Sequence, residues 1–205
     1  MNPVFADLTK FTILVVCTGN ICRSPLAEWL LAKELALGDL VTVVSAGTSA
    51  MVSHDAPDEI WKVAAGYGVN RKAAHFARQL SSEMIADADL ILSATREHRA
   101  DVARLYPKSA AYSFTLRQFA RLVGQLETPF ASEMLSPVLA LRAVVAEVAA
   151  NRGAFAPPVD PSDDDVADPF RRSVEDYARA GRQIHDAVAT ISTVCAQSIE
   201  GGVVR

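Results

Sequence analysis

The chain carries a cysteine and an arginine six residues apart in a stretch that can bind a phosphate group. The stretch reads CTGNICRSP and runs from Cys17 to Pro25. A cysteine attacks phosphorus as its thiolate, and the planar guanidinium of an arginine binds two oxygens of one phosphoryl group. This pattern predicts that Cys17 is a nucleophile beneath a phosphoryl group bound by Arg23.

The flanking residues place this stretch between a strand and a helix. Residues 11–17 form an apolar, β-branched run typical of a buried strand, and residues 25–37 show helical spacing before Gly38. A loop that passes into a helix presents backbone N–H groups, and the helix start favours an anion. Such surroundings lower the pKa of a cysteine below about 8.5, so we expect a thiolate at neutral pH.

Small and polar residues shape the predicted loop. Gly19 permits a backbone turn that is closed to residues with a Cβ, and Asn20 tolerates a left-handed conformation better than most residues do. Ser24 can donate a hydrogen bond to the Cys17 sulfur or help it leave. We expect the whole loop to bind phosphate: Thr18, Gly19, Asn20, Ile21, Cys22, Arg23 and Ser24.

The rest of the chain predicts alternating strands and helices. Further strands are expected at 40–45, 87–94 and 110–114, and helices at 57–66, 96–105, 115–126, 136–153 and from Val174 to Cys195. This alternation indicates an α/β fold, a three-layer domain whose sheet of about four parallel strands has helices on both faces. We expect one domain over 1–205, with a core at 11–124 and 166–199 and an inserted or extended segment at about 125–156.

Composition narrows the kind of protein. The 205 residues carry a formal net charge of -4, which argues against a general nucleic-acid surface, and no stretch is long and apolar enough for a membrane span. No signal peptide is evident, and three cysteines do not suit a secreted disulfide framework, so we expect a cytoplasmic protein. The histidines show no metal-ligand spacing, and the predicted chemistry needs no metal or cofactor.

The motif CTGNICRSP resembles the phosphate loop of low-molecular-weight protein-tyrosine phosphatases. SAGT (45–48), HFARQL (75–80), ADLIL (88–92) and DPF (168–170) follow in the family's order. The resemblance implies that Cys17 is the nucleophile, Arg23 the phosphate and transition-state ligand and Asp168 the general acid. It also implies a hydrogen-bond network that holds the loop in shape, formed by Asn20, Ser24, Ser45 and His75.

The general acid is the least certain choice from chemistry alone, because five aspartates lie close together: Asp160, Asp163, Asp164, Asp165 and Asp168. Most acidic runs are simply solvated. Asp168 is favoured because Pro169 stiffens the backbone after it and Phe170 offers an apolar wall. The family usually has DPY here, so Phe170 lacks a hydroxyl and a possible phosphorylation site.

Three further residues bear on substrate and regulation. Met51 stands where many family members place an aromatic residue that walls the substrate slot, and the alternative is an ordinary surface residue. Cys22 either forms a reversible disulfide with Cys17, as the resemblance implies, or only packs in the loop. Cys195 falls on the apolar stripe of the last helix and is expected in the core.

Hydrolysis of phosphotyrosine in a protein substrate through a cysteinyl-phosphate is the leading hypothesis. A protein-arginine phosphatase is a close alternative, but those enzymes tend to have threonine where this chain has Ile21. An arsenate reductase would need more thiols than Cys22 and Cys195 to relay a disulfide. A phosphotyrosine-binding protein without turnover is the alternative of another class, and it would not need both a nucleophile and an acid.

Overall fold

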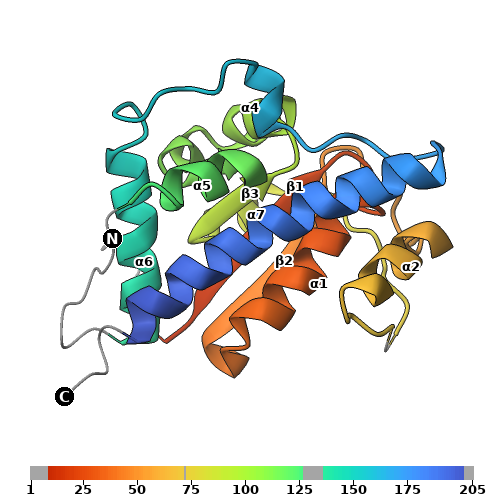
Figure 1. The fold of residues 1–205 in the computed structure, drawn as a ribbon, viewed down its shortest axis with the longest axis horizontal. Coiled ribbons are helices and arrows are strands. Elements are labelled where there is room, and N and C mark those ends of the chain that lie inside the picture. Colours follow the sequence, from red (N-terminus) through yellow and green to blue (C-terminus); the bar gives the residue numbers. More distant parts are fainter. Residues whose placement is uncertain (1–8, 72, 127–135, 201–205) are drawn as a thin grey trace.

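A four-stranded parallel sheet forms the centre of the molecule (Figure 1). The structure is a computed structural model, and it describes residues 9–71, 73–126 and 136–200. The sheet order is β2-β1-β3-β4, with β1 at Phe11–Cys17, β2 at Val41–Gly47, β3 at Leu90–Ser93 and β4 at Ser113–Thr115. The predicted α/β fold class is therefore confirmed.

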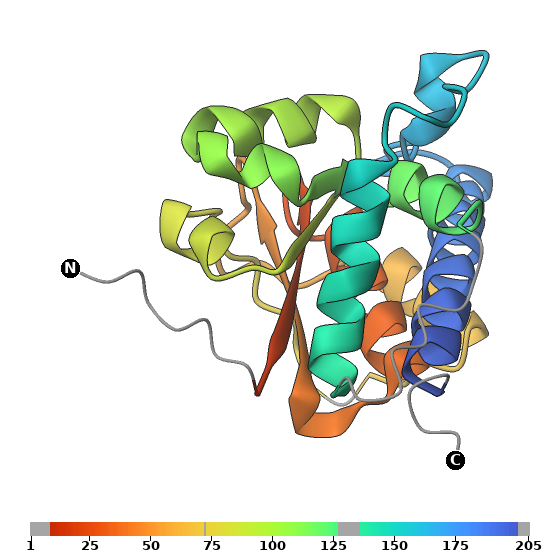
Figure 2. The same cartoon turned by 90° about the vertical axis from the view of Figure 1, so that its left-hand side faces the viewer.

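Helices cover both faces of this sheet, as Figure 2 shows. One face carries α1 (Arg23–Leu35), α5 (Leu116–Val123), α6 (Pro137–Ala150) and α7 (Val174–Glu200), with α2 (Asp58–Gly66) packed beyond them. The opposite face carries α3 (Ser82–Ala86) and α4 (Arg96–Leu105). Short 3-10 helices lie at Gly38–Leu40, Pro107–Ala111 and Pro161–Asp164.

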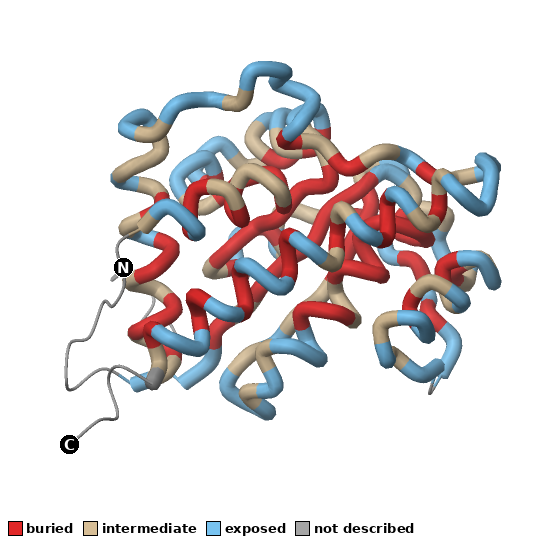
Figure 3. Tube along the Cα trace, in the orientation of Figure 1, coloured by how far each residue is buried: buried red, intermediate tan, exposed pale blue. Residues whose placement is uncertain are grey.

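Alternation along β1 explains the two apolar layers. Ile13 and Val15 belong to the large core cluster under α1, α5, α6 and α7, whereas Leu14 and Val16 belong to the smaller cluster under α3 and α4. A strand buried on both faces reads as a continuous apolar run, which is why this strand was visible in the sequence. Strands β1, β3 and β4 are buried almost throughout, whereas the first half of the edge strand β2 is only partly buried, and Figure 3 colours the chain by this burial.

Several predicted boundaries were wrong by a few residues. The first helix ends at Leu35, because Ala36 caps it in a left-handed conformation two residues before Gly38, which also has a positive φ but begins the next 3-10 helix. The fourth strand begins at Ser113, since Pro107–Ala111 forms a 3-10 helix. The third strand is shorter than 87–94, and α3 just before it was not predicted.

The last third of the chain packs against the core. Ser136 caps α6 by accepting a hydrogen bond from the Leu139 amide, as expected of a Ser-Pro helix start. Val138, Leu141 and Val144 of this helix are buried in the large cluster. Residues 127–135 of the predicted extra segment lie outside the described residues. No helix in the ranges that the structure describes has the length and apolarity to cross a membrane.

Candidate active site

The loop after β1 lies where the sheet order changes direction. β1 pairs with β2 on one side and with β3 on the other, so the connections that follow β1 and β3 diverge at the carboxyl edge of the sheet. Ligands of open α/β sheets bind at this kind of position. Residues 18–22, which we call the phosphate loop, run from β1 directly into α1 at this edge.

Backbone hydrogen bonds turn the carbonyls of the phosphate loop outward. The carbonyls of residues 17–19 accept from the amides of Thr48, Ser49 and Met51 at 2.9–3.0 Å. The next carbonyl, of Asn20, accepts from His75 Nε2 at 2.7 Å. With these carbonyls engaged from outside, the peptide planes direct their N–H groups to the inside of the loop.

The segment that supplies these amides must approach the loop very closely. A Cβ at Gly47 would lie only 2.3 Å from the carbonyl oxygen of Thr18. A side chain larger than a hydrogen would therefore push the two segments apart. Gly47 is the glycine of the SAGT motif, and this close approach explains why the motif has glycine at that position.

The inner amides of the phosphate loop remain available for an anion. Within the described parts of the chain, the amides of residues 19–23 donate to no protein acceptor. Successive free amides at a helix start form an anion-binding nest. The left-handed residue of this turn is Asn20, with φ of 54°, whereas Gly19 has no positive φ. The prediction that Gly19 supplies the conformation closed to other residues was therefore wrong.

Asn20 is held by its side chain in this unusual conformation. Its Nδ2 donates to Ser45 Oγ at 2.7 Å and to Ser24 Oγ at 3.0 Å, and its Oδ1 accepts from the amide of Arg78 at 2.8 Å. Ser45 in turn donates to the carboxylate of Glu28. Burial raises the pKa of Glu28, which favours its neutral form. The residues predicted to hold the loop in shape thus come together around Asn20.

Cys17 and Arg23 are buried together at the phosphate loop and line the same pocket. The Cys17 sulfur is 2.9 Å from Ser24 Oγ, and both residues are buried. Arg23 is also buried, and no atom of the described residues accepts a hydrogen bond from its Nε. A buried donor without an acceptor is costly, and a bound oxyanion would satisfy it.

Asp168 is the aspartate of its run that reaches Arg23, with Oδ2 3.1 Å from Nη2. Its side chain is 54% exposed. Asp160 instead accepts from the Ser162 amide, and Asp163 is exposed. Among the five candidates of the sequence, the structure brings Asp168 alone, of the described aspartates in that run, to the lining of the pocket above Cys17.

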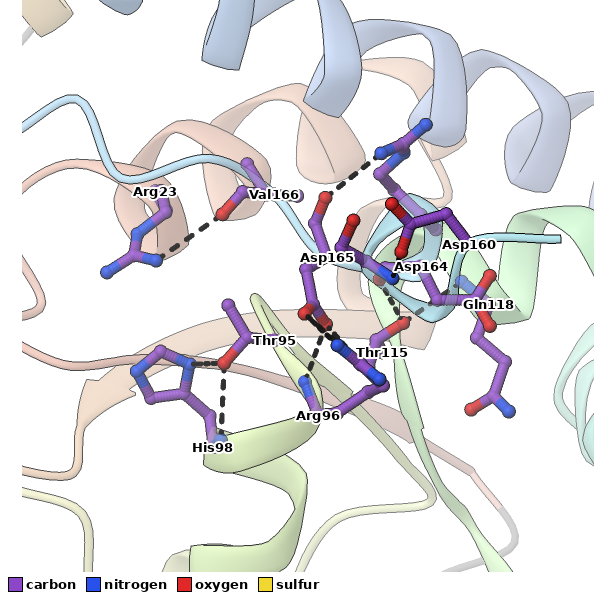
Figure 4. Close-up of polar contacts among 12 residues, drawn as sticks. Arg23, Thr95, Arg96, His98, Thr115, Gln118, Asp160, Asp164, Asp165 and Val166 are labelled. Atoms are coloured by element: carbon purple, nitrogen blue, oxygen red, sulfur yellow. Dashed lines mark hydrogen bonds and ion pairs between the residues drawn. The ribbon is translucent and has the colours of Figure 1, made fainter. Parts of the chain in front are cut away.

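The neighbouring aspartates are not simply solvated. Asp164 pairs with Arg121 at 2.9 Å, and Asp165 pairs with Arg96 at 3.0 Å. Figure 4 shows Arg96 and Asp165 facing each other, and it shows the carbonyl of Val166 accepting from Arg23. Residues 160–170, which we call the acid loop, are therefore held by charged contacts before they reach Asp168.

A pocket of about 160 Å³ opens above the phosphate loop. Met51 and Phe170 lie in its lining, as predicted for the substrate walls, and so does Ser49, which the sequence analysis missed. The full lining is Cys17, Thr18, Gly19, Ile21, Cys22, Arg23, Ser49, Met51, Asp168 and Phe170. Its walls offer apolar surface, and its floor offers a thiol and a guanidinium.

A much larger cavity of about 870 Å³ lies on the other side of His75. Trp29 and Trp61 line it and stack at 4.0 Å between ring centroids. Cys17 and Arg23 are not in its lining. The larger cavity is therefore not the candidate active site. The smaller pocket is, because Cys17, Arg23 and Asp168 line it.

The two other cysteines are poor nucleophiles. Burial, followed by the nearby Cys17 and Asp168, raises the pKa of Cys22 to about 12. Burial alone raises the pKa of Cys195 to about 12 in the core between helices. Both thiols stay protonated at neutral pH, so Cys22 is a weak resolving thiol for a disulfide with Cys17.

His98 also contacts the phosphate loop, although the only role considered for it from the sequence was that of a metal ligand. Its Nε2 is 2.8 Å from Thr18 Oγ1, and its Nδ1 is 2.7 Å from Thr95 Oγ1. No spacing in the sequence links His98 with residue 18, because the sheet alone brings them together. Over the described ranges, no group of three His, Cys, Asp or Glu side chains is arranged to hold a metal ion.

The sequence matches known phosphatases. The family model described as low molecular weight phosphotyrosine protein phosphatase matches residues 12–151. The low molecular weight protein-tyrosine-phosphatase Etp of Escherichia coli (strain K12) is 46% identical over 103 residues, which are 50% of this chain and 67% of Etp. The protein-arginine-phosphatase of Geobacillus stearothermophilus is 36% identical over 121 residues, 58% of this chain and 79% of the relative.

The fold matches solved structures as well. The tyrosine phosphatase AmsI of Erwinia amylovora superposes with a TM-score of 0.64 at 25% identity, covering 94% of this chain and 99% of AmsI. The family match extends over more than half of the chain and includes the phosphate loop and the segments that support it. The chain belongs to the low-molecular-weight phosphotyrosine protein phosphatase family.

Proposed function

We propose that this protein hydrolyses phosphotyrosine in protein substrates through a cysteinyl-phosphate on Cys17. The observation that carries the proposal is the shared pocket of Cys17, Arg23 and Asp168 above a loop of free amides. The family match and the tyrosine-phosphatase names of the relatives support the same activity. A binding protein would need the amides and the guanidinium, but not a thiol and an acid at one phosphorus.

The first chemical step forms the S–P bond. The amides of the phosphate loop and the Arg23 guanidinium bind the phosphoryl oxygens, and the Cys17 thiolate attacks phosphorus opposite the ester oxygen. The P–O bond breaks, and protonated Asp168 donates its proton to the leaving phenolate. Such proton donation is typically worth about 10²–10⁴ in rate.

The second step returns the enzyme to its starting state. Asp168, now a carboxylate, takes a proton from water, and the resulting hydroxide attacks phosphorus. The S–P bond breaks, and the electron pair returns to Cys17 as thiolate. Ser24 supports this departure, because its hydroxyl lies 2.9 Å from the sulfur and can donate a hydrogen bond to it.

Pocket shape supports tyrosine over serine. Met51 and Phe170 lie in the same lining as Cys17 and Arg23, so they can contact an aryl ring whose phosphoryl group is bound there. Phosphoserine brings no ring to these two side chains. We therefore expect aryl phosphates to be turned over much faster than phosphoserine peptides.

Ile21 bears on the alternative of arginine phosphatase activity, which the similarity to the Geobacillus stearothermophilus protein raises. Ile21 lies in the pocket lining and brings no hydroxyl that could orient water toward a phosphoramidate-derived intermediate. Its apolar side chain suits a tyrosine ring better than a guanidinium. We therefore rank phosphotyrosine first and phosphoarginine second.

The test is phosphate release from matched peptides that carry phosphotyrosine, phosphoarginine or phosphoserine. We expect release from the phosphotyrosine peptide, and none of it in Cys17→Ser. Faster release from the phosphoarginine peptide would reverse the ranking of the two activities. Hydrolysis that persists in Cys17→Ser would refute the cysteinyl-phosphate route.

We also propose that the reaction takes place in the cytoplasm on one domain. The three cysteines are free and buried, which suits a reducing compartment. Helix α6 packs against α7 and the sheet, which supports treating the segment at about 125–156 as an addition to the catalytic domain rather than as a second domain.

A further inference from the structure

The first turn of α4 lies between the phosphate loop and the acid loop. It begins after β3, beside the end of β1, so it occupies the other side of the diverging sheet edge. Thr95 caps it by accepting from the His98 amide. Its side chains contact both loops, and no role in the reaction described above uses them.

His98 connects this turn with the phosphate loop. It is 6% exposed, and its ring nitrogens lie against the hydroxyls of Thr18 and Thr95. Thr18 Oγ1 also accepts from Arg23 Nη2 at 3.3 Å. Because arginine is only a donor, the Thr18 hydroxyl keeps its own proton free to donate to the imidazole of His98. A neutral imidazole can accept this proton, so Arg23, Thr18 and His98 form one chain of hydrogen bonds that ends on α4.

The charges around His98 favour this neutral form. Burial, followed by the Arg23 guanidinium, lowers the pKa of His98. Three carboxylates act in the opposite direction and more weakly than the leading causes: Asp101, Glu97 and Asp168. A protonated imidazole would place a second cation beside Arg23 and would lose its capacity to accept from Thr18.

Arg96 connects the same turn with the acid loop (Figure 4). Its backbone amide donates to Asp165 Oδ1 at 2.8 Å, and its guanidinium donates to both carboxylate oxygens at 3.0–3.3 Å. The amide of Val166 donates to the carbonyl of Ala94, one residue before Thr95, at 2.8 Å. These contacts fix the acid loop at Asp165 and Val166, which lie three and two residues before Asp168.

We propose that the first turn of α4 is a positioning clamp, in which His98 sets the phosphate loop through Thr18 and Arg96 sets Asp168 through Asp165. The inference rests on the proposed function, because it concerns the distance between the acid and the reacting phosphorus. Displacements of about 1 Å at a reaction centre can cost about a hundredfold in rate. A single rigid turn that holds both loops removes their independent motion.

The Arg96 half of the clamp is tested by leaving groups. We expect Arg96→Gln to lower kcat/KM for phenyl phosphate about tenfold more than for p-nitrophenyl phosphate, because only the poorer leaving group depends strongly on a well-placed acid. Arg104→Gln is the matched control, since Arg104 lies on the same helix, is 74% exposed and pairs only locally with Asp101. An equal loss on both substrates would overturn this half.

The His98 half is tested by binding rather than turnover. We expect His98→Ala to lower the affinity for inorganic phosphate about tenfold, as measured by calorimetry, because Thr18 loses the hydrogen bond that holds it beside Arg23. His98→Gln should restore most of this affinity, since an amide oxygen can accept from Thr18. His185→Ala on α7 is the control for removing a histidine. Unchanged phosphate affinity in His98→Ala, or no rescue by glutamine, would overturn this half.

Failure of the clamp can be told from failure of the proposed function. If the wild-type protein binds phosphate but shows no Cys17-dependent hydrolysis, the proposed function fails, while the calorimetry still decides on His98. If hydrolysis is present and either half of the clamp gives its contrary result, the clamp is wrong. Urea unfolding of each variant checks folding, and Thr18→Val replaces His98→Ala if that variant does not fold.

Discussion

The phosphate loop and the acid loop are held in place by different physical means. Neutral, buried hydrogen bonds hold the phosphate loop, centred on Asn20 and its contacts with Ser24 and Ser45. Ion pairs hold the acid loop, chiefly the buried Asp164 with the partly exposed Arg121, and the more exposed pair of Asp165 with Arg96. Buried neutral contacts are little affected by salt, whereas charged contacts near the surface are screened by it.

This difference suits the task of each loop. Ionised carboxylates close to a bound dianion weaken its binding, because like charges repel. The carboxyl group that does support the phosphate loop, Glu28, has a raised pKa because it is buried. The acid loop only has to carry Asp168 to the rim, and charged contacts at a distance from phosphorus do not oppose binding.

The largest effect should come from the end of the acid loop itself. We expect Asp168→Asn to lower kcat on phenyl phosphate by about 10²–10⁴ while leaving the free energy of unfolding nearly unchanged, because the side chain is half exposed. Steady-state kinetics and urea unfolding measure the two quantities. A variant that kept full activity would remove Asp168 as the general acid.

The phosphate loop should show the reverse pattern, with a large change in stability. Asn20→Ala removes three hydrogen bonds and leaves a residue with a Cβ at φ of 54°, so we expect unfolding to become about 2–4 kcal/mol easier. Asn20→Gly keeps the backbone unstrained and should lose less. Equal losses in the two variants would show that left-handed strain contributes nothing.

A smaller effect is expected from the ion pairs that hold the acid loop. We expect Asp164→Asn to destabilise the fold by about 1–2 kcal/mol at low salt, since it leaves Arg121 without its charged partner. Asp163→Asn, one residue away and exposed, should change little. In 1 M NaCl the wild-type stability should move part of the way toward that of the Asp164 variant, because Arg121 is partly exposed while Asp164 is buried. The cost of Asn20→Ala should stay the same. A salt-independent difference would contradict the charged character of these contacts.

The smallest effect should be a pH dependence that arises from His98. Its pKa is lowered in the fold, so the unfolded chain binds a proton more readily and stability falls as pH drops below about 6.5. We expect His98→Gln to make the unfolding free energy less dependent on pH between about 7 and 5. If the unfolding free energies of wild type and variant changed in parallel with pH, the pKa of His98 would be the same in the folded and unfolded states.

The sequence was sufficient to predict the sheet and a loop that joins its first strand to the first helix, because each has a local signature. β1 is a continuous apolar run, and the loop combines a thiol, an arginine and small residues within nine positions. Contacts between distant segments had no such signature. The pairing of Asp164 and Asp165 with arginines and the contact of His98 with Thr18 depend on strand order, which no spacing encodes.

Local conformation was also misread where two residues competed for one task. Gly19 was expected to supply the unusual backbone of the phosphate loop, but Asn20 has the positive φ there. Gly38 was expected to end the first helix, but Ala36 ends it two residues earlier, although Gly38 has a positive φ as well. Tertiary hydrogen bonds compensate the strain at Asn20, so intrinsic preference alone did not decide the turn.

Among the residues that the structure describes, the buried Nε of Arg23 finds no hydrogen-bond acceptor. Orthophosphate, the product, can accept a hydrogen bond from this donor as a substrate can, so it should raise the melting temperature and slow turnover together. Enzyme output in the cell would then follow the ratio of phosphorylated substrate to free phosphate, and dephosphorylation would slow when phosphate is abundant.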